Sequence, residues 1–287
     1  MPTGNNKLRT LIESALLEDI GMGDVTTDAI VPPNLTATAE IRVKEDGIIA
    51  GLAVIDEIFQ VVDQGVNIDL MCEDGRPVKA SSIVGIINGS CGSILKSERT
   101  LLNILQRMSG IATLTHAFVE SVAGTNAKIT DTRKTAPGLR LLDKMAVRLG
   151  GGVNHRFGLD DMILIKDNHI TAAGSITEAI RRCKKYIAKM KNPLKIEVET
   201  KNLAEVEEVL RIGTIDRIML DNFSLDDIKK AVILINRAVQ IEASGNITLA
   251  NVRAIAETGV DYISVGALTH SPRALDISLK ITPKLSI

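Results

Sequence analysis

From about residue 127 to about residue 267, short apolar runs alternate with longer segments that carry apolar residues at helical spacing. The apolar runs are AKITDT, DMILIKDN, LKIEVET, RIMLDN, VQIEAS and YISVGA. The later runs are separated by SITEAIRRCKKYIAKM, NLAEVEEVLRIG, SLDDIKKAVILIN and TLANVRAIAETG. This alternation predicts βαβ units and a parallel sheet, and six units favour a closed or nearly closed α/β barrel. A doubly wound open sheet is the main alternative, but no G-x-G-x-x-G motif follows the first strand.

The first hundred or so residues follow a different pattern. LRTLIESALLEDI and VIDEIFQVV have helical spacing, GMGDVTTDAIVPP is rich in turn formers, and TATAEIRVKEDGIIAGL alternates like a strand with a break at Asp46-Gly47. VNIDLMCEDGRPVKASSIVGIINGSCGSIL indicates short strands, and SERTLLNILQRMSGIATLTHAFVESVAG indicates a longer helix. We therefore predict an α+β sandwich domain over residues 1–112, completed by residues 273–287, and an α/β barrel over residues 113–272.

Polar residues follow each apolar run of the second half. In an α/β barrel the carboxyl ends of the strands form the active-site face, so these six segments are expected to converge on one pocket. A structural explanation stands beside this one, because Asp, Asn and Ser also favour turns and helix caps. The residues concerned are Asp131, Thr132, Arg133, Lys134, Lys166, Asp167, Asn168, His169, Glu197, Glu199, Asp221, Asn222, Glu242, Ser244, Gly245, Asn246 and Gly266.

Cations are concentrated near the first two of these strand ends. Arg133-Lys134 follows the first run, His155-Arg156 follows a triple glycine, and Lys166 closes the run MILI. A solvated surface would also explain the paired cations, but glycines let the backbone approach a ligand closely. Lys166 would place its stem in the barrel mouth and its charge in the pocket.

The overall charge is nevertheless balanced. There are 34 Lys and Arg against 35 Asp and Glu, aromatic residues make up 2%, and Trp is absent. A nucleic-acid-binding protein is usually basic with interleaved aromatics, so the cation cluster points to a small anionic ligand instead. No apolar run is long enough to cross a bilayer and no signal-peptide segment is seen, so a cytoplasmic location is expected. The three separated cysteines predict neither a disulfide framework nor a zinc site.

Two glycine loops predict a phosphate site. Ser244-Gly245-Asn246 and Val265-Gly266-Ala267 each follow a strand and precede a helix. Loops after the last barrel strands often hold a phosphate through backbone N–H groups. Glu199 and Asp221 supply acids for sugar hydroxyls or Mg²⁺. A polycarboxylate and a phosphorylated sugar would satisfy this pocket.

Several long blocks also carry a family resemblance. They are LLEDIGMGDVTTDAIVP, SERTLLNILQRMSGIAT, TDTRKTAPGLR, KMAVRLGGGVNHRFGLDDMILIKDNHI, IEVET, MLDNFS, EASGNIT and GVDYISVGALTHS. Through them the chain resembles the quinolinate phosphoribosyltransferases, also called carboxylating nicotinate-nucleotide pyrophosphorylases, over nearly its whole length. The resemblance implies a TIM-like barrel of atypical strand number after the sandwich domain. It also implies phosphoribosyl transfer from phosphoribosyl pyrophosphate to quinolinate with decarboxylation, a step of NAD biosynthesis that uses Mg²⁺.

The resemblance further implies roles for individual residues. The quinolinate carboxylates would contact the clustered cationic residues and the adjacent Thr132. The full set is Thr132, Arg133, Lys134, His155, Arg156 and Lys166. Glu199 and Asp221 would hold the ribose and Mg²⁺, directly or through the pyrophosphate. The 5-phosphate would meet the two glycine loops, namely Ser244, Gly245, Asn246, Val265, Gly266 and Ala267. The catalytic residues would be Lys134, Lys166, Glu199 and Asp221.

A homodimer with shared active sites is implied as well, in which the sandwich domain of one subunit caps the barrel of the other. Arg99 would then reach quinolinate in the partner subunit. Arg99 is expected in the first turn of the helix ERTLLNILQRM, where a cation is unfavourable with the helix dipole and should need a compensating anion.

Three other functions stay open at this point. A phosphoribosyltransferase or pyrophosphorylase of the same fold could use another acceptor, although the dense cations argue against an uncharged one. A phosphate-binding isomerase or aldolase could use Lys166 as a Schiff-base lysine. The third is a binding protein without activity.

Overall fold

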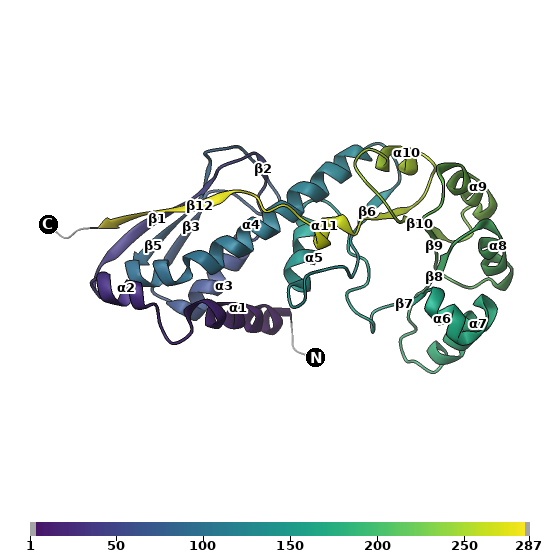
Figure 1. The fold of residues 1–287 in the computed structure, drawn as a ribbon, viewed down its shortest axis with the longest axis horizontal. Helices are drawn as coiled ribbons and strands as arrows, with labels where there is room; N and C mark the ends of the chain where they lie inside the picture. Colours follow the sequence, from purple (N-terminus) through teal and green to yellow (C-terminus); the bar gives the residue numbers. More distant parts are fainter. Residues whose placement is uncertain (1–3, 285–287) are drawn as a thin grey trace. The chain divides into compact units, whose positions relative to one another are not determined.

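The computed structural model describes residues 4–284, and the chain divides into two compact units (Figure 1). The first comprises the described parts of Met1–His116, Thr135–Gly151 and Thr269–Ile287. The second comprises Ala117–Lys134 and Gly152–Leu268. The domain limits expected from the sequence stay a prediction. The compact units differ from them mainly because Thr135–Gly151 groups with the first unit.

A four-stranded antiparallel sheet forms the framework of the first unit. Its order is β12 (Ile277–Lys284), β1 (Thr36–Val43), β5 (Ile83–Ser90) and β3 (Asn67–Leu70). Every second residue of β1 is buried, since alternate side chains of a strand point to opposite faces. A separate antiparallel pair joins β2 (Gly47–Ile48) to β4 (Pro77–Val78).

Helices complete the first unit. They are α1 (Gly4–Ile20), α2 (Val25–Ile30), α3 (Leu52–Val62), most of α4 (Cys91–Ser121), α5 (Arg140–Leu149) and the second half of α11 (Ala267–His270). The buried residues of α3, from Leu52 to Phe59, recur at helical spacing and supply one apolar face. Arg107 on α4 donates to buried Asp143 on α5 through Nε to Oδ1, at 2.7 Å.

The second unit is a parallel α/β barrel. Its six strands run in the order β6 (Lys128–Thr130), β11 (Tyr262–Ser264), β10 (Gln240–Ser244), β9 (Arg217–Asp221), β8 (Ile196–Thr200) and β7 (Ile163–Ile165). Every residue of β8 is buried, as expected for a strand covered on both faces. Among the described residues β6 and β7 do not pair with each other, and Thr130 instead bridges to Val153. The two-domain α/β prediction is thus confirmed.

Helices lie outside this curved sheet (Figure 1). They are α6 (Asp167–Ala173), α7 (Ile176–Ile187), α8 (Leu203–Ile212), α9 (Leu225–Ile235) and α10 (Val252–Ala256). Ser175, Asn202 and Ser224 cap α7, α8 and α9 with side-chain oxygens. Each cap accepts a backbone N–H that the first helical turn leaves unpaired.

Some local predictions were wrong. The turn-rich stretch after Gly23 contains α2, because Asp24 caps that helix. CGSIL is helical, since α4 begins at Cys91. Arg99 therefore lies about two turns into α4, so the argument from the helix dipole does not apply to it. Among residues 4–284, no helix combines the length and the apolar character needed to cross a membrane.

Candidate active site

The carboxyl ends of the barrel strands lie in register. Ser244 pairs with Asp221 on one side and with Ser264 on the other, and Ser264 pairs with Thr130. The segments that follow these residues therefore leave the sheet at one end of the second unit. They include about half of the residues singled out in the sequence, because parallel strands present their carboxyl ends to the same edge.

Asp131 joins two cation segments that are far apart in the sequence. Its fully buried carboxylate accepts from the backbone N–H of His155 at 2.8 Å and from Nδ2 of Asn154 at 2.6 Å. Asp131 directly precedes Thr132-Arg133-Lys134, so the segment around His155-Arg156 is held next to them. The sequence placed these cations at separate positions, and the structure brings them together.

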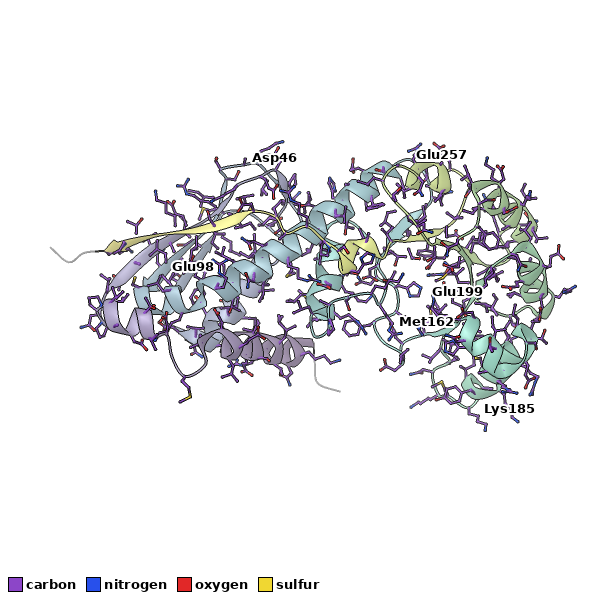
Figure 2. The ribbon with its side chains drawn as sticks, viewed as in Figure 1. Asp46, Glu98, Met162, Lys185, Glu199 and Glu257 are labelled. Atoms are coloured by element: carbon purple, nitrogen blue, oxygen red, sulfur yellow. The ribbon has the colours of Figure 1, made fainter. Side chains whose placement is uncertain are left out.

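Two guanidinium groups lie close enough to repel each other. Burial lowers the pKa of Arg156, and the charge of Arg133 lowers it further. Arg156 is buried, and its Nη1 donates at 2.9 Å to the carbonyl oxygen of Met162, a residue labelled in Figure 2. A bound anion would relieve this repulsion, which makes the pair a candidate carboxylate site. Lys134 is exposed, and its backbone N–H donates to Oγ1 of Thr132.

Lys166 forms an ion pair with Glu199. The lysine follows β7 and its side chain is 43% exposed, whereas that of Glu199, on β8, is only 9% exposed. The contact joins Nζ to Oε2. A cation predicted to bind one ligand and an acid predicted to bind another are therefore direct neighbours, which neither sequence motif indicated.

Asn222 connects the ends of β9 and β10. Its Nδ2 donates to Oδ2 of Asp221 at 3.0 Å, and its Oδ1 accepts from Nδ2 of Asn246 at 3.0 Å. Both Asn222 and Asn246 have positive φ angles. A Cβ added to Gly245 would lie 2.2 Å from Oδ1 of Asn222, so only glycine fits there without a shift. The loop at Ser244-Gly245-Asn246 is thus fitted against Asp221.

The second glycine loop follows β11. The backbone N–H of Val265 donates to the carbonyl oxygen of Thr130 at 2.9 Å, which continues the pairing of β11 with β6. Gly266 comes next, and α11 begins at Ala267. The loop therefore lies at the same end of the sheet as Gly245.

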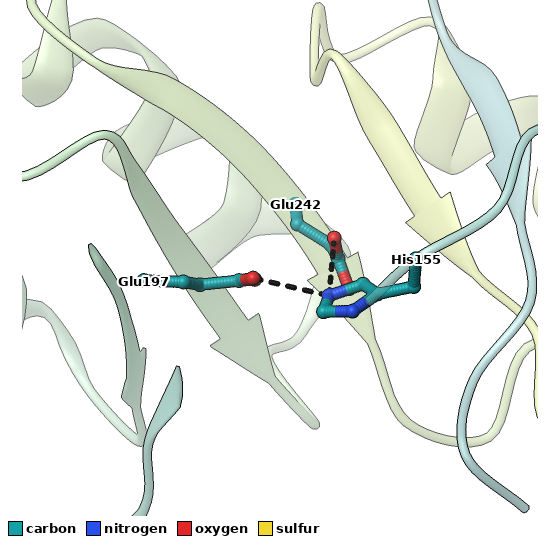
Figure 3. Close-up of side chains that lie close together, drawn as sticks. All are labelled: His155, Glu197 and Glu242. Atoms are coloured by element: carbon teal, nitrogen blue, oxygen red, sulfur yellow. Dashed lines mark ion pairs between the residues drawn. The ribbon is translucent and has the colours of Figure 1, made fainter. Parts of the chain in front are cut away.

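A cluster of four ionisable side chains lies inside the barrel, and we call it the core cluster. It comprises His155, Glu197, Arg217 and Glu242. Nε2 of His155 lies 3.0 Å from Oε2 of Glu197 and 3.5 Å from Oε2 of Glu242 (Figure 3). Nη1 of Arg217 donates to the same oxygen of Glu242 at 2.6 Å, and its guanidinium stacks 3.8 Å from the ring centroid of Tyr262. Both carboxylates are fully buried.

The core cluster favours one extra proton. Burial lowers the pKa of His155, but hydrogen bonds with Glu197 and Glu242 outweigh it and raise that pKa to about 9. Burial and the charge of Glu242 also raise the pKa of Glu197. Burial would raise the pKa of Glu242 too, but His155 and Arg217 hold it below its usual value. Two buried carboxylates face one guanidinium, so one extra proton restores neutrality. It lies on Glu197, because Nδ1 of His155 accepts the backbone N–H of Arg156 and the imidazole is therefore neutral.

Of the four residues in the core cluster, only His155 had a predicted role in the site. Glu197 and Glu242 were noted only as polar residues on strands, and Arg217 was missed. One signal was present, because a charged residue inside a strand buried on both faces must have a buried partner.

Arg99 is exposed on α4 of the first unit.

Glu199 and Asp221 have the donor chemistry for Mg²⁺. That ion prefers oxygen ligands and is usually held by one or two carboxylates together with substrate phosphates. Asp221 is part-exposed beside the glycine loop, which fits such an arrangement. The core cluster fits Mg²⁺ poorly. Its three donor atoms from His155, Glu197 and Glu242 lie within 4.8 Å of one another, but one donor is an imidazole and Arg217 already contacts Glu242.

Comparisons with known proteins cover both halves of the chain. The family model for the quinolinate phosphoribosyl transferase N-terminal domain matches residues 24–109, and the model for the C-terminal domain matches residues 111–280. Quinolinate phosphoribosyltransferase [decarboxylating] 1b of Nicotiana tabacum is 47% identical over 98% of this chain and 84% of its own length. A probable nicotinate-nucleotide pyrophosphorylase [carboxylating] of Synechocystis is 46% identical over 94% of this chain and 91% of its own.

Solved structures of similar fold also match this chain over nearly its whole length. NadC from Streptococcus pyogenes has a TM-score of 0.92 and 40% identity, and the match covers 99% of both chains. The nicotinate-nucleotide pyrophosphorylase from Francisella tularensis has a TM-score of 0.91 and 40% identity over 98% of both chains.

Proposed function

The chain belongs to the quinolinate phosphoribosyltransferase family, and from that premise we propose how its residues carry out the reaction. The enzyme transfers the phosphoribosyl group of phosphoribosyl pyrophosphate to quinolinate with decarboxylation. The products are nicotinate mononucleotide, pyrophosphate and CO₂, and the reaction serves NAD biosynthesis. The observation that best supports the assignment of the site is the joining of Arg133 and Arg156 beside Asp131, near one end of the barrel.

Quinolinate binds through its two carboxylates in this proposal. Arg133 and Arg156 receive them, because a guanidinium can donate two parallel N–H bonds to a carboxylate. Lys166 adds a point charge, and Thr132, Lys134 and His155 border the same site. The repulsion between the two guanidiniums supports the proposal, since an anion converts it into attraction.

Lys166 and Glu199 exchange partners as substrates bind. Their ion pair neutralises both groups before binding. A quinolinate carboxylate competes for Nζ of Lys166, and Glu199 becomes available to the ribose hydroxyls. The first substrate thus prepares the site of the second. An ion-paired ammonium is a poor nucleophile, so the contact counts against a Schiff base on Lys166.

Phosphoribosyl pyrophosphate occupies the other side of the site. The two glycine loops at Gly245 and Gly266 cradle its 5-phosphate with Ser244, Asn246, Val265 and Ala267. Asp221 and Glu199 hold the ribose. Mg²⁺, held by these acids directly or through the pyrophosphate, would neutralise charge on the leaving group.

Transfer begins when the pyridine nitrogen attacks C1 of the ribose as pyrophosphate leaves. Glu199 and Asp221 stabilise the oxocarbenium-like sugar, and Lys134 and Lys166 stabilise negative charge. The nitrogen becomes positive in the product of this step. That charge stabilises the carbanion left when the adjacent 2-carboxylate departs as CO₂, and a proton from solvent then adds to this carbon to give nicotinate mononucleotide. Positioning and electrostatics thus supply the catalysis.

We also propose a cytoplasmic homodimer in which Arg99 completes the quinolinate site of the partner subunit. Its exposed position on α4 leaves the guanidinium available to another chain.

The proposed function is tested by incubating the protein with quinolinate, phosphoribosyl pyrophosphate and Mg²⁺. Nicotinate mononucleotide should form, and nicotinate or nicotinamide in place of quinolinate should give little product, because nicotinate lacks one of the two carboxylates and nicotinamide lacks both. Equal turnover of nicotinate would point to a different acceptor. Borohydride trapping of substrate on Lys166 would instead support the lyase alternative.

A further inference from the structure

The core cluster is not explained by the proposed function alone. Two carboxylates with no exposed surface, a guanidinium and an imidazole are held inside the barrel. Replacing a buried ionic group by apolar residues is often neutral or stabilising, so stability is a weak reason for its presence. A role in the site explains it better.

The core cluster lies directly beneath the site. On β8, Glu197 precedes Glu199 by two residues, and on β10, Glu242 precedes Ser244 by two residues. Residues two apart on a strand share a face and are separated by about 7 Å along it. The core cluster therefore forms the layer below the side chains assigned to the ribose and the phosphate.

His155 links this layer to the main chain at Arg156. On one side, its Nε2 faces Glu197 and Glu242. On the other, its Nδ1 accepts the backbone N–H of Arg156 at 2.8 Å. Both ring nitrogens are thus engaged within the protein. This arrangement fits an imidazole that orients its neighbour better than one that binds substrate with its own nitrogen.

We propose that Glu197, Arg217 and Glu242 are positioning residues that act through His155 to place the guanidinium of Arg156 in the quinolinate site. Arg217 fixes Glu242 by a direct contact and by its stacking on Tyr262. The two carboxylates fix the imidazole, and the imidazole fixes the Arg156 main chain. This inference rests on the proposed function, because it assigns Arg156 to a substrate carboxylate.

A test compares steady-state kinetics of wild type, Glu242→Gln and the control Val198→Ala. Val198 is buried on β8 between Glu197 and Glu199 and faces away from them, so its truncation weakens the fold without touching the core cluster. Glu242→Gln should raise the KM for quinolinate about tenfold or more, as expected when Arg156 loses a charge-assisted contact. The KM for phosphoribosyl pyrophosphate should stay within about twofold. Val198→Ala should lower thermal stability without raising the KM for quinolinate above the KM for phosphoribosyl pyrophosphate in relative terms, and we call that selective rise the split between the two KM values.

A double variant separates positioning from general damage. If Glu242 acts through Arg156, then Glu242→Gln combined with Arg156→Ala should raise the quinolinate KM no further than Arg156→Ala alone. The inference would be overturned if the quinolinate KM of the double variant rose by the product of the two single-variant increases. It would also be overturned if Glu242→Gln changed both KM values equally. If Glu242→Gln does not fold, Arg217→Lys keeps the charge but loses the planar fork and should show the same split.

Two further outcomes are decisive. About one equivalent of a divalent metal in purified wild-type protein, lost in Glu242→Gln, would make the core cluster a metal site and overturn its positioning role. A wild-type protein without quinolinate turnover would contradict the proposed function and this inference together. An active wild type whose Glu242→Gln variant shows no split between the KM values would contradict the inference alone.

Discussion

Replacing Gly245 by alanine should damage the phosphate loop through one identifiable contact. The added Cβ would lie 2.2 Å from Oδ1 of Asn222, 2.5 Å from its Cγ and 2.9 Å from its backbone nitrogen. The side chain of Asn222 can swing away, but its backbone N–H is tied to the carbonyl oxygen of Ser244 at 2.9 Å. Relief of the clash must therefore break the contacts of Asn222 with Asp221 and Asn246 or shift the loop itself.

The size of the effect follows from two contributions. Gly245 has a φ of +96°, a conformation that costs an alanine about 1–2 kcal/mol. The overpacking adds about 1–3 kcal/mol. Gly174 is a matched control because its φ is +98° and nothing lies within 4 Å of an added Cβ. Gly174→Ala should therefore show the conformational cost alone.

Urea unfolding and the KM for phosphoribosyl pyrophosphate should be measured for both variants. Gly245→Ala should lose about 1–3 kcal/mol more stability than Gly174→Ala, and it alone should raise that KM. The quinolinate site is not involved, so the quinolinate KM should change little. If the two variants match in stability and in KM, the fitted contact between Asn222 and the loop is not what holds the phosphate site.

Four further predictions address the rest of the site. Lys166→Ala should lower kcat/KM for quinolinate by about 1.5–3 kcal/mol with the fold intact by circular dichroism, and wild-type kcat/KM would place the site elsewhere. Activity should vanish with a chelator and return with Mg²⁺, and Asp221→Asn should impair use of phosphoribosyl pyrophosphate more than quinolinate binding; full activity would remove Asp221 from this role. Because burial and the charge of Glu242 raise the pKa of Glu197 above 4.5, the stabilisation from its protonated form is complete below pH 4.5 and is lost as the pH rises through the raised pKa; urea unfolding should show this loss, and Glu242→Gln should reduce it. Mixing the impaired variants Arg99→Ala and Lys166→Ala should restore about a quarter of wild-type activity above their own residual rates, since about half of the dimers are mixed and each has one intact site. No recovery despite subunit exchange would place Arg99 in its own site or in none.

The barrel was predictable because its pattern is local. Runs such as IEVET and RIMLD are apolar over strand length, and the helices between them repeat at helical spacing, so each element could be identified from its own residues. Boundaries near caps were harder. Asp24 caps α2 within a stretch that is rich in turn-forming residues, so that helix was not predicted. Helix α4 begins several residues before the start expected from the sequence.

The candidate site was predictable only in part. Parallel strands end at the same edge of the sheet, so the residues at their ends can converge on one site. Lys166, Glu199 and Asp221 were predicted as site residues on this basis. It could not show that Lys166 pairs with Glu199, since that contact depends on the three-dimensional placement of β7 beside β8. Arg217 was missed because it begins a strand, where a charged residue is ordinarily a solvated end.

The most direct test of the account follows the carbon that the reaction should release. Quinolinate labelled in its 2-carboxylate should be incubated with the protein, phosphoribosyl pyrophosphate and Mg²⁺, and the label should be followed in CO₂ and in the nucleotide. One labelled CO₂ and one pyrophosphate are expected for each unlabelled nicotinate mononucleotide formed. Label retained in a nucleotide product, or CO₂ released without phosphoribosyl pyrophosphate, would contradict it.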